Sequence, residues 1–259
     1  MSILVEVCAG SIKDCMIAQK CGADRIELNS GLALGGLTPS FATLKMVKRT
    51  VTLPIMSMVR PRGGGGFCYD AYESAVMFED ARNLIELGSE GIVFGFLKED
   101  FTIHTQLTKE MVDLCHASGR EAVFHRAFDV VKDPFKAVED LIRCGVDRIL
   151  TSGLEDKAID GTDLLKELHT RYGDRIEIVI GSGVSVDNVE TLVRSTGINQ
   201  VHGSFKQWFS DPTSSRDKVS YAYSNEGSFD GVSKDKLREF INKVGFLLID
   251  DAANDSPIS

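Results

Sequence analysis

Side chains that can move protons stand at the ends of several short apolar runs. Glu6 and Glu27 lie in two of these runs, and His125 and His202 end two others. Carboxyl and imidazole groups are the usual general acids and bases near neutral pH. Asp129 follows His125 closely enough to orient its imidazole, although a histidine bonded to a backbone carbonyl would give the same sequence. We predict these five residues as candidate catalytic groups.

Two arginines stand before a run of glycines at the end of another apolar run. Arg60 and Arg62 precede residues 63–66, which are all glycine. A guanidinium group binds carboxylate or phosphate through parallel hydrogen bonds, and glycine leaves the rim of a site flexible. Arg60 is therefore predicted to act with the catalytic groups, and Arg62 is predicted to bind an anion. Both are also expected to pair with Glu6 and Glu27.

Glycine–serine turns follow three of the later apolar runs. In many barrel proteins the backbone N–H groups of such turns hold a phosphate. Tight strand-to-helix turns without a ligand would give the same pattern. The residues predicted here to bind an anion are Ser152, Gly153, Gly181, Gly183 and Ser204.

The elements that must position these groups alternate along the chain. Eight β-rich runs are separated by segments with helical periodicity, which predicts a parallel sheet. Eight such units in 259 residues favour a single-domain α/β fold, the TIM (β/α)8 barrel. A doubly wound open sheet is the alternative, but it favours a GxGxxG motif after the first strand, where residues 8–11 read CAGS. The expected strands are 3–7, 25–28, 55–59, 91–94, 122–125, 148–151, 177–180 and 200–202, and the expected helices are 12–20, 41–49, 72–87, 108–117, 134–143, 162–171, 186–195 and 234–244.

Side-chain alternation along the strands places the polar residues on one face. Glu6 shares its face with Cys8, and Glu27 shares its face with Asn29. We expect this face to line the barrel and its polar groups to gather at the carboxyl ends of the strands, where barrel active sites form. The amino ends show no such cluster. A structural ring of salt bridges in the lumen is the alternative, and it can coexist with a site.

The last part of the chain departs from this pattern. Residues 205–232 are rich in Ser, Asp and Gly and are too long for an ordinary strand-to-helix connection. We expect this insertion to be either a lid over the pocket or a mobile segment. The barrel domain is predicted to cover residues 1–249, and residues 250–259 are predicted to form a flexible C-terminal tail.

Composition narrows the class of protein. A formal net charge of −9 argues against general binding to nucleic acid or to an anionic membrane. The sequence shows no secretory signal or membrane-spanning run, so a cytoplasmic protein is expected. The six cysteines include no CxxC pair, which argues against a disulfide framework and a structural zinc site.

Motifs between about residues 3 and 205 together resemble the CutC family. They are Glu6-Val7-Cys8, GADRIEL at 22–28, GGLTPS at 35–40, RPRGG at 60–64, FHRAFD at 124–129 and RILTSG at 148–153. The resemblance implies a TIM barrel and a cytoplasmic copper-binding protein of copper homeostasis. It also implies a homo-oligomer in many members, with no settled enzymatic reaction.

This resemblance directs attention to sulfur, because copper(I) prefers soft ligands. Cys8 and Met58 are the implied metal ligands, and His125 or His202 could add nitrogen; relatives often carry a second cysteine where this chain has Asn29. The expected function is copper(I) binding or trafficking, with a buried, inert Cys8 as the alternative for that residue. The alternative function is a TIM-barrel enzyme of unknown reaction that acts on a small anionic or phosphorylated metabolite.

Overall fold

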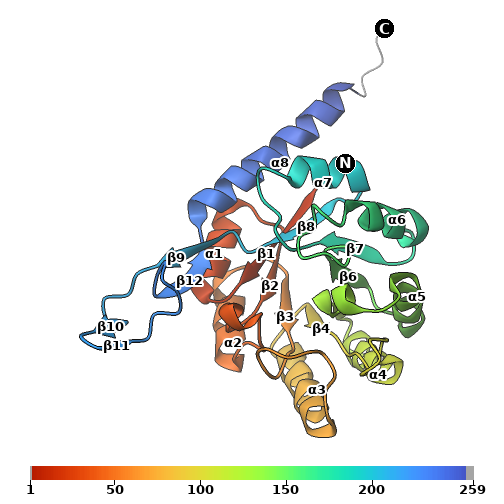
Figure 1. Cartoon of the computed structure of the whole chain (residues 1–259), viewed down its shortest axis with the longest axis horizontal. Coiled ribbons are helices and arrows are strands. Elements are labelled where there is room, and N and C mark those ends of the chain that lie inside the picture. The colour runs from red at the N-terminus through yellow and green to blue at the C-terminus, as the bar shows by residue number, and fades with distance from the viewer. Residues whose placement is uncertain (1, 255–259) are drawn as a thin grey trace.

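The computed structural model describes residues 2–254 and contains a closed barrel surrounded by helices (Figure 1). The barrel strands are parallel and pair in chain order, and the eighth strand pairs with the first to close the barrel. The single-domain TIM barrel predicted from the sequence is confirmed. The strands are β1 (Leu4–Ala9), β2 (Arg25–Leu28), β3 (Ile55–Met58), β4 (Gly91–Phe94), β5 (Glu121–Phe124), β6 (Arg148–Thr151), β7 (Glu177–Ile180) and β8 (Gln200–Gly203).

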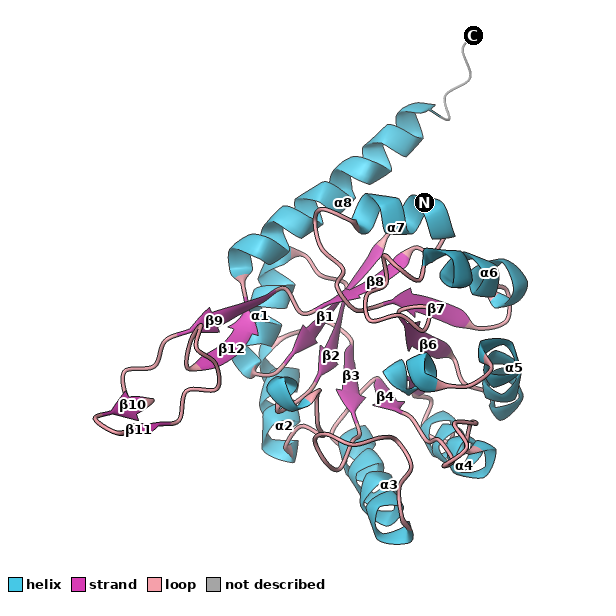
Figure 2. Cartoon of the chain, viewed as in Figure 1, coloured by secondary structure: helices cyan, strands magenta, loops and turns pink. Residues whose placement is uncertain are grey.

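Helices connect the strands and surround the barrel (Figure 2). They are α1 (Ile12–Cys21), α2 (Phe41–Thr50), α3 (Ala71–Glu86), α4 (Thr105–His116), α5 (Pro134–Cys144), α6 (Thr162–Tyr172), α7 (Val189–Thr196) and α8 (Lys234–Asn254), with short 3-10 helices η1 (Leu32–Leu34) and η2 (Arg126–Val130). Ser11 caps α1 by accepting a hydrogen bond from the backbone N–H of Asp14, and Gly22 ends that helix with a left-handed φ of 89°. Asp70 and Glu73 form a capping box at the start of α3.

The strand register places the polar faces of β1 and β2 inside the barrel. Glu6 lies opposite Arg25, and Cys8 lies opposite Glu27. The intervening Val5 and Val7 belong to the large core between the strands and the helices, whereas the lumen holds a separate apolar cluster of Met56, Met58, Val93 and Val123. The alternation predicted from the sequence therefore positions the inward-facing groups.

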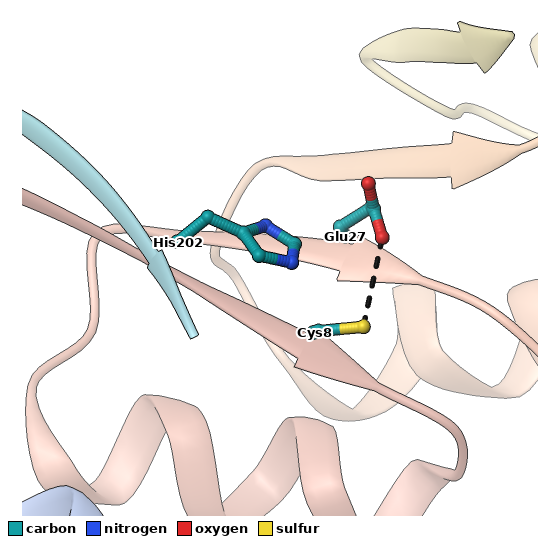
Figure 3. Close-up of side chains that lie close together, drawn as sticks. All are labelled: Cys8, Glu27 and His202. Carbon is teal, nitrogen blue, oxygen red and sulfur yellow. Dashed lines mark hydrogen bonds between the residues drawn. The ribbon is translucent and has the colours of Figure 1, made fainter. Parts of the chain in front are cut away.

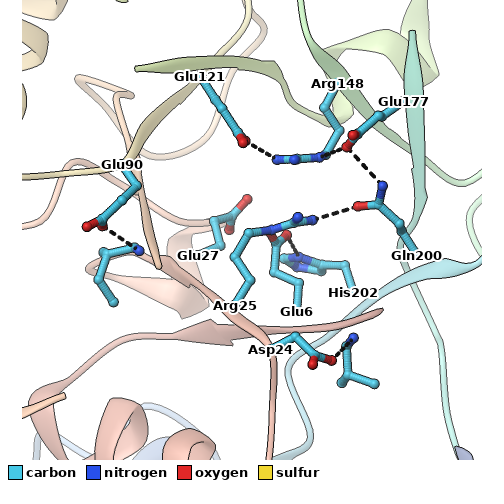
Figure 4. Close-up of polar contacts among 12 residues, drawn as sticks. Glu6, Asp24, Arg25, Glu27, Glu90, Glu121, Arg148, Glu177, Gln200 and His202 are labelled. Atoms are coloured by element: carbon cyan, nitrogen blue, oxygen red, sulfur yellow. Dashed lines mark hydrogen bonds and ion pairs between the residues drawn. The ribbon is translucent and has the colours of Figure 1, made fainter. Parts of the chain in front are cut away.

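A charged network occupies the amino ends of the strands (Figure 4). Arg25, the first residue of β2, forms an ion pair with Glu6 and donates a hydrogen bond to Gln200 at 3.0 Å. Gln200 donates to Glu177 at 2.9 Å, and Arg148 donates to the same carboxylate at 2.8 Å. The expectation of amino ends without a polar cluster is wrong, because β2, β6 and β7 begin with charged side chains that meet there. Ion pairs of the kind considered as an alternative are therefore present, but among the described residues they join β1 to β2 and β5 to β6 and β7, so they form no closed ring.

The insertion before the last helix forms a two-stranded arm. β9 (Lys206–Phe209) pairs antiparallel with β12 (Phe229–Val232), and β10 (Ser215–Arg216) pairs with β11 (Val219–Ser220) near the tip. The arm projects away from the barrel (Figure 1), and only its base borders the pocket at the strand ends, through Lys206 and Asp230. Backbone pairing explains this arrangement, because the two halves of the insertion bond to each other along their length.

The final helix is longer than predicted. α8 continues to Asn254, so residues 250–254 of the expected tail are helical, and residues 255–259 lie outside the described residues. Within residues 2–254 no helix combines the length and the apolar character needed to cross a membrane.

Candidate functional site

A cavity of about 260 Å³ opens where the barrel strands end. Glu27, Arg60, His125 and His202 line it as the alternation predicts, whereas Glu6 lies deeper in the lumen beside Arg25 and does not line it. Cys8, Asn29, Met58, Phe67 and Ser204 line the cavity as well. A second hollow of about 340 Å³ lies between α1 and the arm and contains none of the predicted site residues.

Three potential metal ligands from adjacent strands face one another in this cavity (Figure 3). The sulfur of Cys8, a carboxylate oxygen of Glu27 and a ring nitrogen of His202 all lie within 4.8 Å of one another. The Cys8 thiol donates a hydrogen bond to Glu27 at 3.6 Å, and Nδ2 of Asn29 donates to the Cys8 sulfur at 3.5 Å. Barrel closure produces this group, because β8, β1 and β2 are neighbours.

Glu6 orients His202 from below the cavity. Nδ1 of His202 lies 2.8 Å from one carboxylate oxygen of Glu6, and Arg25 pairs with the other oxygen. Burial alone would raise the pKa of Glu6, but the hydrogen bond from His202 and the charge of Arg25 lower this pKa to about 2. The ionised carboxylate therefore holds the N–H on Nδ1 and leaves Nε2 of His202 for a ligand.

Without a metal, Cys8, Glu27 and His202 shift one another's pKa values. Burial, followed by the negative charge of Glu27, raises the pKa of Cys8 well above its usual value. Burial also raises the pKa of Glu27, although His202 opposes this shift. Burial lowers the pKa of His202, but the carboxyl groups of Glu27 and Glu6 outweigh that effect and raise it overall. A metal ion bound here would have to displace the thiol proton of Cys8.

Comparison with known proteins identifies the family. A family model described as CutC matches residues 3–207. The chain belongs to the CutC family. A CutC family protein from Treponema denticola is 42% identical over 247 residues, which cover 94% of this chain and 99% of that protein.

Two further relatives agree with this assignment. A human protein named copper homeostasis protein cutC homolog is 40% identical over 199 residues, which cover 77% of this chain and 72% of the human protein. The crystal structure of a CutC protein from Streptococcus agalactiae matches with a TM-score of 0.73 and 33% identity, covering 78% of this chain and 98% of that one. The resemblance seen in the sequence motifs is confirmed. The family model ends within β9, so most of the arm lies beyond it.

His125 and Asp129 do not pair as predicted for this CutC chain. Nδ1 of His125 accepts a hydrogen bond from the backbone N–H of Ala127 at 3.0 Å. Asp129 accepts from Nε of Arg126 at 2.7 Å and from the backbone N–H of Ser152 at 2.9 Å. The spacing was misleading because the intervening residues form the 3-10 helix η2, which turns the two side chains toward different neighbours.

Internal hydrogen bonds already use the turns predicted to bind an anion. The backbone N–H of Gly153 donates to Oγ1 of Thr151, and that of Gly181 donates to the carbonyl of Thr151, each at 3.0 Å. The Asp129 carboxylate takes the Ser152 N–H that a phosphate could have used. Gly183 does not line the cavity. For Ser152, Gly153 and Gly181 these contacts support the alternative of tight turns without a ligand, whereas anion binding by Ser204, which lines the cavity, stays a prediction.

Arg62 lies outside the cavity. It forms an ion pair with Glu73, and its guanidinium group lies 5.2 Å from the centre of the Tyr69 ring. The predicted pairing of Arg60 and Arg62 with the lumen carboxylates is wrong, since Arg25 takes that role. Side-chain alternation could not predict the direction of the Arg62 side chain, because β3 ends at Met58 and the chain turns after it.

Acid is expected to weaken the fold in part through His125. Burial and the charge of Arg60 lower the pKa of His125 from 6.5 to about 3. Below pH 6.5 the unfolded chain takes up a proton that the native imidazole does not. The free energy of unfolding should therefore fall by up to roughly 1.4 kcal/mol per pH unit until the pH approaches 3. Urea unfolding between about pH 7 and 4.5 should show a shallower loss for His125→Gln than for the wild type. Equal slopes would contradict a buried neutral imidazole.

Proposed function

We propose that this CutC chain binds copper(I) at the mouth of its barrel, through Cys8 and His202 with Glu27 beside them. The observation that carries the proposal is the placement of sulfur, nitrogen and oxygen donors within 4.8 Å of one another in one cavity. The names of the human and Streptococcus agalactiae relatives, which refer to copper homeostasis and to CutC, support copper as the metal.

The donor set fits this ion. Copper(I) favours thiolate and thioether sulfur, and imidazole nitrogen also suits copper. Met58 lines the same cavity and offers a thioether, as expected from the sequence. His202 is better placed than His125 to supply nitrogen, because it belongs to the group that contains Cys8.

The contact between Glu6 and His202 also favours a metal site. Histidine ligands of metals commonly donate their second ring N–H to a carboxylate, which fixes the ring and increases the basicity of the ligating nitrogen. His202 has this arrangement with Glu6 at 2.8 Å. Asn29, which stands where relatives often carry a second cysteine, donates to Cys8 and Glu27 instead. We therefore propose one sulfur from cysteine in this site.

Competition titration with a copper(I) chelator tests whether His202 is a copper ligand. The wild type and a His104→Asn control should each bind one equivalent tightly, because His104 only caps α4 and asparagine is a good cap. His202→Gln should bind at least about 10-fold more weakly, since it loses the imidazole ligand. Equal binding by His202→Gln and the wild type would remove His202 from the site. Absence of tight binding by the wild type would end the proposal.

Other expectations remain predictions. A cytoplasmic location, self-association and a catalytic use of Glu27 or His125 follow from the sequence or the family resemblance, and the copper proposal does not depend on any of them.

A further inference from the structure

Arg60 is a buried cation beside the cavity. Arg60 is only 7% exposed. Its Nη1 donates to the carbonyl oxygens of Gly35 and Gly36 at 3.0 and 3.2 Å. Its Nε has no hydrogen-bond partner, and within residues 2–254 no carboxylate lies in ion-pair distance of the guanidinium group. A buried charge without a counter-ion is costly, so this arrangement calls for an anion.

Three further polar atoms at the same cavity also lack partners, and one of them is Oδ2 of Asp230, a carboxylate oxygen at the base of the arm. Nδ1 of His125 accepts a hydrogen bond from Ala127, so Nε2 carries the proton, and this N–H is unpaired. Nδ2 of Asn29 donates to Glu27 at 2.7 Å, whereas its Oδ1 accepts nothing. His125 and Asn29 are at least nine-tenths buried. Since buried polar groups are nearly always hydrogen-bonded, four unpaired atoms around one cavity indicate a ligand.

We propose that the cavity binds a small hydroxy- or amino-carboxylate. The Nε–H of Arg60 and the Nε2–H of His125 donate to the two carboxylate oxygens, and Oδ1 of Asn29 accepts from the hydroxyl or ammonium group of the ligand. The cavity of about 260 Å³ has room for a molecule of this size but not for a large cofactor. The aromatic ring of Phe67, whose centre lies 5.4 Å from the Arg60 guanidinium carbon, forms an apolar wall.

A carboxylate fits these donors better than a phosphate. The unpaired Nε–H of Arg60 and Nε2–H of His125 match the two oxygens of a carboxylate. The unpaired acceptors Oδ1 of Asn29 and Oδ2 of Asp230 suit a neighbouring hydroxyl or ammonium group, whereas they would repel the further oxygens of a phosphate. The turn after β6 is already bonded to Asp129, whose carboxylate accepts from the backbone N–H groups of Ser152 and Leu154. Arg62, the second arginine of the motif, points elsewhere and pairs with Glu73.

The carboxylate site shares the cavity with the proposed copper ligands but uses different side chains. Arg60 and His125 follow β3 and β5, whereas Cys8, Glu27 and His202 belong to β1, β2 and β8. Asn29 contacts both sets, because its Nδ2 donates to Cys8 and Glu27 while its Oδ1 stays unpaired. The proposal therefore goes beyond copper binding and can be tested on metal-free protein.

Isothermal titration of the metal-free full chain with defined probes tests this site. L-lactate, glycerate and L-serine represent the proposed class, acetate lacks the second polar group, and inorganic phosphate represents the competing class. At least one hydroxy- or amino-carboxylate should bind saturably and at least about 10-fold more tightly than acetate, because acetate leaves Asn29 unpaired. Arg60→Met should weaken that binding at least about 10-fold, and Arg62→Met should not change it.

A second measurement decides the matter if Arg60→Met does not fold. In the wild type, the imidazole Nε2–H proton signal of His125 should shift when the best carboxylate probe is added. No saturable binding by any carboxylate, equal binding by the Arg60 and Arg62 variants, or an unmoved His125 signal would overturn the site. Binding of phosphate that depends on Arg60, with none of the carboxylates bound, would overturn the ligand class. Neither result bears on the copper proposal, which the competition titration with a copper(I) chelator tests separately.

Discussion

Replacing Cys8 with serine is expected to weaken copper(I) binding by at least about 100-fold. Loss of an outer-shell partner of a metal site typically costs about 10- to 100-fold in affinity, and loss of the soft sulfur ligand itself should cost no less. Serine keeps a hydroxyl group that can donate to Glu27 as the thiol does, so the fold should persist. Competition titration with a copper(I) chelator measures the change.

Cys68→Ser is the matched control for this prediction. Cys68 is a free cysteine on the surface, outside the cavity. The Cys68→Ser variant should still bind one equivalent of copper(I) with the affinity of the wild type. If Cys68→Ser loses the tight equivalent and Cys8→Ser keeps it, copper binds at the surface and the barrel mouth is not the site.

Replacing Arg25 with methionine is expected to lower the free energy of unfolding by about 3–5 kcal/mol. Arg25 is 5% exposed and pairs with Glu6, which is 4% exposed, so the substitution leaves a buried carboxylate without its cation. The hydrogen bond from Arg25 to Gln200 is lost as well. Urea unfolding followed by circular dichroism measures this free energy.

Arg82→Met provides the comparison for the buried pair. Arg82 pairs with Glu79 along α3, and both side chains are more than half exposed. Exposed pairs of this kind contribute less than about 1 kcal/mol, so this variant should remain close to the wild type. Similar losses in the two arginine variants would show that the amino-end network does not stabilise the barrel.

Local sequence patterns were sufficient to predict the barrel and most of its inward-facing residues. Alternation assigns Cys8, Glu27 and His202 to the lumen because each lies within or at the end of a strand, where the period of two holds. The amino-end network was missed because Arg25 and Arg148 follow the similar phrases GAD and GVD, which read as helix-to-strand turns. Their side chains enter the lumen because they are the first residues of their strands.

Contacts beyond the strand ends could not be predicted from local patterns. His125 and His202 occupy similar positions in the sequence, and only barrel closure places β8, rather than β5, beside β1. Asp129 bonds to Arg126 and Ser152 because η2 redirects it. Glu27 was predicted as a catalytic group, and its contact with the Cys8 thiol emerges only from the register of β1 and β2.

The position of copper in the loaded protein tests the central claim most directly. Crystals of the copper(I)-loaded wild type can be measured on both sides of the copper absorption edge, which locates the metal by anomalous scattering. We predict one anomalous peak in the barrel cavity, within bonding distance of the Cys8 sulfur and Nε2 of His202. A peak at the surface beside Cys68, with none near Cys8, would contradict this account.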